Sequence, residues 1–372
     1  MMRASSSSVP LKLELRWWLG GRDALEVEPL LLLLLQEIDN LGSLQMAARA
    51  AACSYRHAWG LLRKWEHLLG HRLVTLERGR GASLAPLGRQ LLREDHHVRA
   101  RLGPELESLA LESGNALSAL LEQGGREIHL RIFASHGLAV SALRDLLLKQ
   151  GGLRVDLQFR GSLDSLRLYR AGKCDAAGFH LPQGALGEKL LPRFTRHLDD
   201  TGDRLVRVVQ REQGLIVTRG NPRAVRKITD LKAPSIRYIN RQPGSGTRLI
   251  FDALLEEAGV NPADINGYHT EEFTHMAVAA LIASGAADAG MGIRAAAARV
   301  GLDFVPWVTE NYYFVFRRDA GRSPPIAHLL AALRGGEYAR EVAALPGYGA
   351  AGAGEIVEIS ELRADLQRKT GR

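Results

Sequence analysis

A loop at residues 240–248 combines glycine, hydroxyl and arginine side chains in a pattern suited to binding a small anion. Its glycines let successive backbone N–H groups converge on one point. The apolar run at 249–258 predicts a helix, whose start adds unbonded N–H donors and the positive end of a dipole. Hydroxyl groups and guanidinium groups complete such a pocket. The loop residues expected to contact the anion are Arg241, Ser245, Gly246, Thr247 and Arg248.

A second chemical signal is the concentration of positive charge near the N-terminus. Between Arg49 and Arg101, eleven basic residues accompany four acidic ones, in a chain whose formal net charge is +8. A strongly basic segment favours a polyanionic partner. The alternative is a basic but merely solvated face of a helical domain.

The elements around this charge follow the order of a winged helix-turn-helix. Helices are predicted at 29–40, 44–52 and 54–69, the last two with Ser43 and Ser54 as N-caps. Short strands at 73–76 and 83–85 surround a basic turn, and an early strand is predicted at 11–18. The third helix would enter the major groove, with the basic turn as the wing. The predicted DNA contacts are Ser54, Tyr55, Arg56, His57, Arg63, Lys64, Arg78 and Arg80.

The rest of the chain alternates strand-like and helical runs. A long amphipathic helix is predicted from Pro86 to about Glu122, followed by a break at two glycines. The runs beyond it predict α/β structure with largely parallel sheets. Strands are expected at 129–133, 154–159, 215–218, 236–239, 286–290 and 304–306. The fold class is therefore multidomain α+β, with domains at 1–85 and 125–372 and a linker or dimerisation helix at 86–124.

Several classes of protein are disfavoured by what the sequence contains. The two cysteines, Cys53 and Cys174, lie far apart without zinc-type spacing, so no metal site is expected. The leucine run at 30–35 is too short to span a bilayer, and residues 1–10 lack the apolar core of a signal peptide. No Walker, zincin or nucleophile-elbow motif is present, so we expect a cytoplasmic protein that is not an enzyme and has no cofactor.

Two segments of the basic region carry a resemblance to a known family. Ser54-Tyr55-Arg56-His57-Ala58-Trp59 and Leu84-Ala85-Pro86-Leu87-Gly88 resemble the N-terminal domain of ModE-type molybdate regulators, and the region is similar to the LysR-type domain as well. The resemblance covers about residues 11–95. It implies DNA binding by a homodimer that pairs through the helix following the wing.

The second half resembles the molybdate-binding type of periplasmic-binding-protein-like domain, from about residue 130 to 319. The resemblance rests on the segments 211–217, 240–248, 274–279 and 286–293. It implies two α/β lobes, at about 125–212 with 308–372 and at about 213–307, with a ligand in the cleft between them. The further ligand contacts it implies are Ser135, His136, Ser162, His180, Thr274 and His275.

Each of these residues has a plainer interpretation. In this interpretation Ser135 and Ser162 are helix caps only, His180 and His275 are ordinary interior or rim residues, and Arg241 pairs with Glu271 or Glu272. The expectation as a whole is a homodimeric regulator that binds DNA and senses a small oxyanion, molybdate or tungstate. The alternatives are an organic anion or a molybdenum-cofactor fragment as effector, or an accessory protein of molybdenum-cofactor metabolism.

Overall fold

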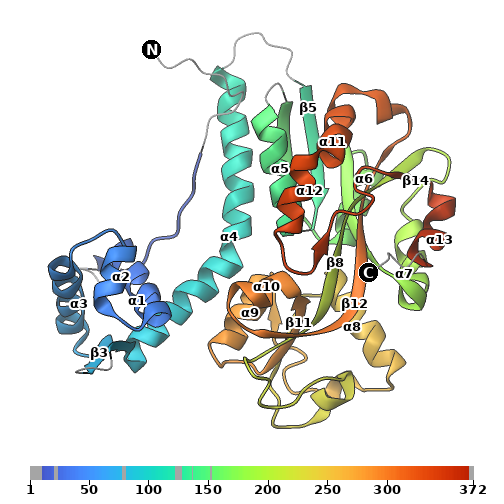
Figure 1. Cartoon of the computed structure of the whole chain (residues 1–372). Coiled ribbons are helices and arrows are strands. Elements are labelled where there is room, and N and C mark those ends of the chain that lie inside the picture. Colours follow the sequence, from blue (N-terminus) through green and yellow to red (C-terminus); the bar gives the residue numbers. More distant parts are fainter. Residues whose placement is uncertain are drawn as a thin grey trace. The chain divides into compact units, whose positions relative to one another are not determined.

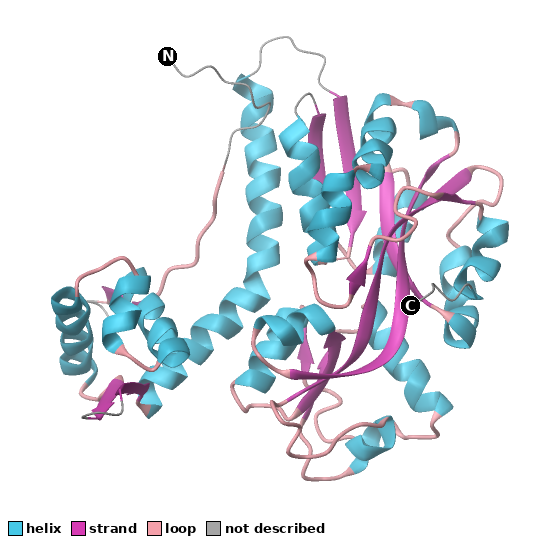
Figure 2. Ribbon diagram, in the orientation of Figure 1, coloured by secondary structure: helices cyan, strands magenta, loops and turns pink. Residues whose placement is uncertain are grey.

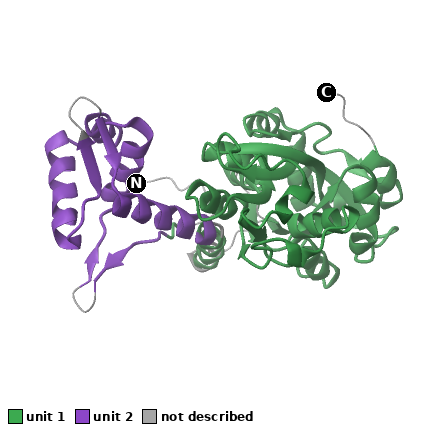
Figure 3. Ribbon diagram, turned by 90° about the horizontal axis from the view of Figure 1, so that it is seen from below, with its two compact units in different colours: residues 1–13, 103–372 green, residues 14–102 purple. Residues whose placement is uncertain are grey.

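The computed structural model describes residues 11–20, 24–77, 81–121, 128–135, 137–150 and 153–367. The chain forms two compact units, coloured separately in Figure 3. The first contains residues 14–102, and the second contains the remainder of the described chain. The boundary falls inside the long helix, so the first unit includes part of the segment that the sequence analysis assigned to a separate linker.

Three helices and a hairpin build the first unit, in the order expected of a winged helix-turn-helix. They are α1 (Pro29–Leu41), α2 (Leu44–Ala50), α3 (Tyr55–Leu69), β3 (Val74–Glu77), β4 (Gly81–Leu84) and the start of α4 (Pro86–Leu121). The hydroxyl of Ser43 accepts a hydrogen bond from the N–H of Met46, which confirms its predicted role as the cap of α2. Gly42 ends α1 in the left-handed conformation, with φ at 64°.

The strand expected at 11–18 is wrong except at its end. Only Trp18–Leu19 (β1) is extended and paired, with Leu25–Glu26 (β2) as its partner. Alternation of apolar and polar residues requires a partner strand of similar length to become a ladder, and β2 supplies two residues. Of the apolar side chains in this segment, Trp17 packs against the core and its indole N–H donates to Asp95 at 2.8 Å, whereas Leu11, Leu13 and Trp18 are exposed.

The second unit is built around one curved sheet flanked by helices (Figure 1). Its first part contains β5 (Ile128–Ala134), α5 (Leu138–Gln150), β6 (Leu153–Phe159), α6 (Ser162–Arg170), β7 (Ala176–Pro182), α7 (Gly184–Thr195) and β8 (Asp203–Val217). The middle part contains β9 (Tyr238–Arg241), α8 (Gly246–Glu257), β10 (Glu271–Glu272), α9 (His275–Ala283), β11 (Ala289–Ile293) and α10 (Arg294–Arg299). The last part contains β12 (Asp303–Arg317), α11 (Pro324–Arg334), α12 (Gly336–Ala343), β13 (Tyr348–Gly349), β14 (Ile356–Val357) and α13 (Leu362–Gln367).

Strands β8 and β12 run through both halves of the sheet, as Figure 2 shows. The strand order is β10-β9-β11-β8-β12-β7-β5-β6. β8 and β12 pair antiparallel from Asp203 opposite Arg317 to Val217 opposite Asp303. On one side β5 pairs parallel with β6 and β7, and on the other β9 pairs parallel with β10 and β11. We call the half with β5–β7 lobe 1 and the half with β9–β11 lobe 2.

The sequence analysis placed these two strands correctly but made them far too short. It expected strands at 215–218 and 304–306, whereas each of β8 and β12 has 15 residues. The polar residues in the middle of both strands interrupt the apolar pattern and hid their continuity. The sheets are therefore parallel within each lobe, as predicted, but antiparallel along the two strands that join the lobes. Among the described residues no helix is long and apolar enough to cross a membrane.

Candidate functional site

Buried charged and polar side chains gather where β8 and β12 pass from one lobe to the other. We call the group His180, Arg211, Gln213, Arg241 and Glu310 the crossing cluster; none is more than 7% exposed. Arg211 of β8 and Glu310 of β12 are opposite each other in the ladder, and the Nε of Arg211 donates to Oε1 of Glu310. Charges this deep are uncommon unless they are paired or bind something.

His180, on β7 of lobe 1, contacts residues of both lobe 1 and the crossing cluster. Its Nδ1 lies 3.0 Å from the hydroxyl of Ser135, just after β5, and its ring stacks on Tyr312 with 4.0 Å between centroids. Its Nε2 lies 3.8 Å from Oε1 of Glu310. Burial, and then the nearby charges of Arg211 and Arg241, hold the pKa of His180 well below its ordinary value. The imidazole is therefore neutral at physiological pH, and a ligand meets it as an uncharged donor or acceptor.

Arg241 brings positive charge from lobe 2. Its Nε and Nη2 donate to the backbone carbonyls of Glu272, at 3.1 Å, and Phe273, at 2.8 Å. Its Nη1 is buried without a hydrogen-bond partner in the described part of the chain. Burial, and then the charge of Arg211, lower the pKa of Arg241 to about 9, although Glu272 acts in the opposite direction. The surroundings thus disfavour the cation, and an anion placed here would relieve that cost.

The predicted anion loop closes against lobe 1. Ser245 is the N-cap of α8, and its side chain accepts a hydrogen bond from the N–H of Arg248. The N–H groups that precede Arg248 at the start of this helix have no intrahelical partners. A Cβ atom on Gly246 would lie 3.7 Å from the hydroxyl of Ser162 and 3.9 Å from Cβ of His180. A Cβ atom on Gly161 would lie 3.0 Å from the carbonyl oxygen of Gly244. Loop residues of both lobes therefore face each other beside the crossing cluster.

Arg248 differs from the other loop residues because its guanidinium is fully engaged. It contacts Asp252 at 2.9 Å and Glu271 at 3.0 Å, and it lies 4.2 Å from the centroid of the Tyr268 ring. This arrangement favours a structural role in lobe 2. The acid pairing considered for Arg241 is thus made by Arg248 with Glu271, while Arg241 itself contacts backbone carbonyls.

Two further predicted contacts lie at the start of α9. The hydroxyl of Thr274 accepts from the N–H of Ala277 at 3.0 Å, so it caps the helix. His275 follows it and is buried, with Nδ1 3.5 Å from the position a Cβ on Gly292 of β11 would take. Thr247, at the start of α8, is 3% exposed. His136 lies outside the described residues.

Sequence reasoning missed three members of the crossing cluster, namely Arg211, Gln213 and Glu310. All lie within or next to segments rich in buried apolar residues, and none is more than 4% exposed. The available signal was their type, because a charged or amide side chain on the buried face of a strand demands a partner. Arg211 and Gln213 are two residues apart on β8 and therefore lie on the same face.

Several side-chain atoms near the crossing have no hydrogen-bond partner in the described part of the chain. They are Oγ of Ser162, both amide atoms of Gln213, Nη1 of Arg241, Oε2 of Glu310 and the hydroxyls of Tyr312 and Tyr348. Buried polar groups are nearly always satisfied, so open donors and acceptors on strands and loops that meet at the crossing indicate a candidate ligand site. Across the described residues, no group of three or more His, Cys, Asp or Glu side chains is arranged to hold a metal ion.

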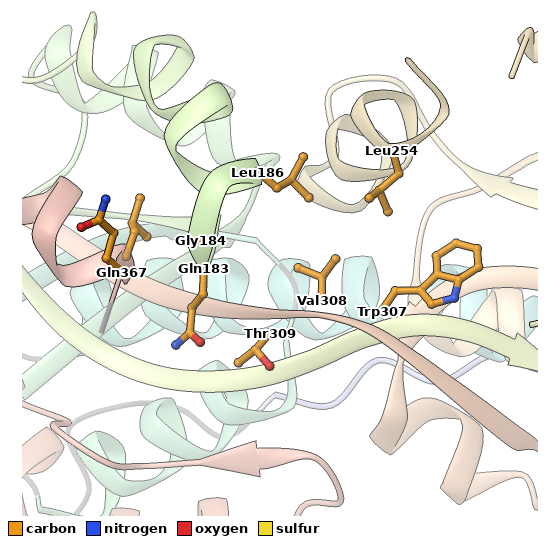
Figure 4. Close-up of a pocket in the computed structure, with 9 residues that line it drawn as sticks. Gln183, Gly184, Leu186, Leu254, Trp307, Val308, Thr309 and Gln367 are labelled. Carbon is orange, nitrogen blue, oxygen red and sulfur yellow. The ribbon is translucent and has the colours of Figure 1, made fainter. Parts of the chain in front are cut away.

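A separate groove of about 380 Å³ lies over β12 at the join between the lobes (Figure 4). Leu186 of α7 in lobe 1 and Leu254 of α8 in lobe 2 form part of its lining. Val308 and Trp307 of β12 complete this part, and the indole N–H of Trp307 donates to the carbonyl of Arg226 at 3.0 Å. Because its walls belong to different lobes, the groove must change shape if the lobes move.

In the first unit, the start of α3 presents the predicted DNA-contact residues. Tyr55 is 50% exposed, and Arg56 and His57 are also exposed, whereas the Ser54 hydroxyl accepts from the N–H of His57 as the N-cap. Lys64 forms an ion pair with Glu28. Arg63 lies over the ring of Trp59, 4.8 Å from its centroid. Arg78 and Arg80 lie outside the described residues.

Comparison with known proteins identifies the second unit. Residues 144–334, about half of the chain, match the family model of the PBP superfamily domain. The chain belongs to the PBP superfamily. The uncharacterized protein YvgK of Bacillus subtilis (strain 168) is 37% identical over 191 residues, which are 51% of this chain and 59% of that protein. An uncharacterized Clostridium pasteurianum protein, encoded in the 5′ region of a ferredoxin 2Fe-2S gene, is 30% identical over 110 residues, 29% of this chain and 97% of that one.

Solved structures similar to this PBP superfamily member include transcription regulators. An OxyR C206 mutant of Corynebacterium glutamicum has a TM-score of 0.41 at 17% identity, covering 84% of this chain and 93% of that one. Full-length CbnR in complex with its target DNA has a TM-score of 0.37 at 18% identity, covering 82% and 97%. Similarity at TM-scores this low does not indicate function.

Proposed function

We propose that this PBP superfamily member is a ligand-responsive DNA-binding regulator. Its first unit would bind double-stranded DNA, and its second would bind a small anionic effector between the two lobes. The observation that carries the sensor half of the proposal is Arg241, a buried arginine whose Nη1 has no partner in the described part of the chain and whose pKa is lowered by burial and by the charge of a second arginine, Arg211.

The start of α3 supports the DNA-binding half. Ser54 caps the helix, so Tyr55, Arg56 and His57 begin a rigid exposed face that carries a full positive charge. The first residues of the helix that follows the turn are those that contact base edges in helix-turn-helix proteins. Arg56 is suited to a bidentate contact with guanine or with phosphate.

The response would come from closure of the lobes. All members of the crossing cluster are buried, so an effector reaches them only when lobe 2 moves away from lobe 1. The effector then shifts the population towards the closed form by no more than its differential affinity for the two forms. We propose that this shift alters how a homodimer engages its operator. The long helix α4 is the proposed pairing element.

Two kinds of small anion are candidates for the effector. Molybdate or tungstate is the first candidate, on the resemblance carried by residues 211–217 and 240–248. An organic anion is the second candidate, and the open amide of Gln213 favours it, since tetrahedral oxyanions offer that group acceptors only. The proposed anion contacts are Ser135, Ser162, His180, Arg241, Gly246, Thr247 and His275, together with Arg211.

The DNA-binding half is tested with the fragment upstream of the protein's own gene, by fluorescence anisotropy at fixed ionic strength. We expect saturable, sequence-dependent binding that Arg56→Ala weakens by about 5- to 150-fold, since a good bidentate base contact contributes about 1–3 kcal/mol. The matched control is Arg237→Gln, an exposed arginine of lobe 2. Equal affinity of the wild type for operator and scrambled DNA would reject the regulator.

A further inference from the structure

The crossing cluster contains an acceptor that a simple oxyanion cannot satisfy. Glu310 is fully buried at 0% exposure, and only its Oε1 is engaged, by Arg211. Its Oε2 has no hydrogen-bond partner in the described part of the chain. A buried carboxylate oxygen without a donor is costly, and an anion without hydrogens bound beside it would add repulsion to that cost.

Gln213 extends the same requirement along β8. It is 0% exposed, and both its amide oxygen and its amide nitrogen are unbonded in the described part of the chain. It lies two residues from Arg211 on the same strand face and is opposite Val308 of β12 in the ladder. The amide oxygen of Gln213 needs a donor and its amide nitrogen needs an acceptor, and a ligand that carries both kinds of group can satisfy both.

Several donors lie on the other side of the site. They are Nη1 of Arg241, the hydroxyl of Ser162 and the first N–H groups of α8 near Gly246. The strand floor adds the acceptor Oε2 of Glu310, beside the amide of Gln213 and the hydroxyl of Tyr312, which can each donate or accept. Of these groups, the Glu310 carboxylate is the one that accepts only.

Resting on the proposed function, we infer that the effector is a small anion that also carries a hydrogen-bond donor, such as a hydroxy acid or a protonated oxyanion. The negative end faces Arg241 and the start of α8, and the donor faces Oε2 of Glu310. The same carboxylate discriminates against fully deprotonated tetrahedral oxyanions such as sulfate at neutral pH, so of the two candidate effectors an organic anion suits the site better than molybdate or tungstate.

The test compares anions that differ in the donor alone, by isothermal titration of the full-length protein at pH 7.4 and constant ionic strength. The matched pairs are hydrogen phosphate against sulfate and lactate against propionate, with molybdate as a separate probe. We expect at least one donor-bearing member to bind at least about tenfold more tightly than its partner and than molybdate. Binding of molybdate or sulfate as tight as that of the donor-bearing anions overturns the inference.

Glu310→Gln tests the cause of the preference. The amide replaces one acceptor oxygen with a donor, so we expect the preference for the donor-bearing anion to fall to about twofold or less. Glu212→Gln is the control, because Glu212 is the neighbouring acid on β8 and pairs with Arg294 instead. A preference that Glu310→Gln leaves unchanged contradicts the inference. Thermal melting reports whether the Glu310→Gln variant is folded. If it is not, the titrations of the wild-type protein with the matched anion pairs still test the inference.

Different results would contradict the anion-sensor function and the preference for a donor-bearing effector. If anions bind and Arg241→Gln weakens them, but donor-bearing and donor-free anions bind equally, the inference about the effector fails and the anion sensor stands. If no probe of either kind binds at millimolar concentration, the proposed sensor function fails as well.

Discussion

Replacement of Arg241 by glutamine is predicted to weaken anion binding by about 10- to 100-fold. Nη1 is the one end of this guanidinium without a partner in the described chain, so a bound anion is expected to take it. Hydrogen bonds to charged groups contribute about 1.5–3 kcal/mol, and each 1.4 kcal/mol is about a factor of ten in affinity. The glutamine amide can keep one backbone contact, to Glu272 or Phe273, but cannot reach the anion with a charge.

The assay is isothermal titration of wild type and variant with the tightest-binding anion of the matched pairs, at constant ionic strength. Arg237→Gln is the control, because this arginine pairs with Asp288 at the surface of the same lobe and its side chain is 50% exposed. The control should bind within about twofold of wild type, as expected of an exposed ion pair. An Arg241→Gln protein that is folded and binds as tightly as the control refutes the assignment of the site.

Three further predictions concern other features. His180 has a lowered pKa, so the folded state holds it neutral while the unfolded state binds a proton below about pH 6.5. Its contribution to stability therefore falls by about 1 kcal/mol between pH 7.5 and 5.5, and urea unfolding should show that His180→Gln removes this part of the pH dependence. Gly88→Ala should destabilise the first unit by about 1–3 kcal/mol, because the added Cβ would lie 2.2 Å from the carbonyl oxygen of Leu73. Gly60→Ala should instead stabilise it by about 0.5–1 kcal/mol, because Gly60 is inside α3 and its added Cβ would have nothing within 4 Å. Denaturation followed by tryptophan fluorescence distinguishes these signs. Anion binding should shift the emission of Trp307, which lines the groove between the lobes, and Trp307→Phe should abolish the shift; an identical shift in that variant would place the change elsewhere.

Much of the first unit could be predicted because its signals are local. Serine caps, helix-ending glycines and the spacing of apolar residues along a helix depend on a few neighbouring residues, and the predicted caps Ser43 and Ser54 are both present. Gly88 in the segment after the wing also has a physical reason, since its helix packs directly on the backbone of Leu73. The strand at 11–18 failed because strand formation depends on a partner that local pattern does not reveal.

The candidate site was predicted only in part because it depends on long-range pairing. The loop at 240–248 carries its own signature of glycines, hydroxyls and arginines, and a helix does follow it, but α8 begins at Gly246 rather than at the expected residue 249, with Ser245 as its cap. Arg211 and Glu310 come from strands 99 residues apart in sequence, and only their register brings them together. Whether Arg241 or Arg248 has an open donor likewise depends on which acids reach each one in the folded chain.

The central claim is that anion binding in the second unit changes DNA binding by the first. The most direct measurement is the affinity of the full-length protein for its upstream DNA across a titration with the tightest-binding anion, at constant ionic strength. We predict a saturable change in affinity whose midpoint matches the calorimetric Kd in the wild type and which is lost in Arg241→Gln. Specific DNA binding that stays constant across the titration, with the anion demonstrably bound, would contradict the account.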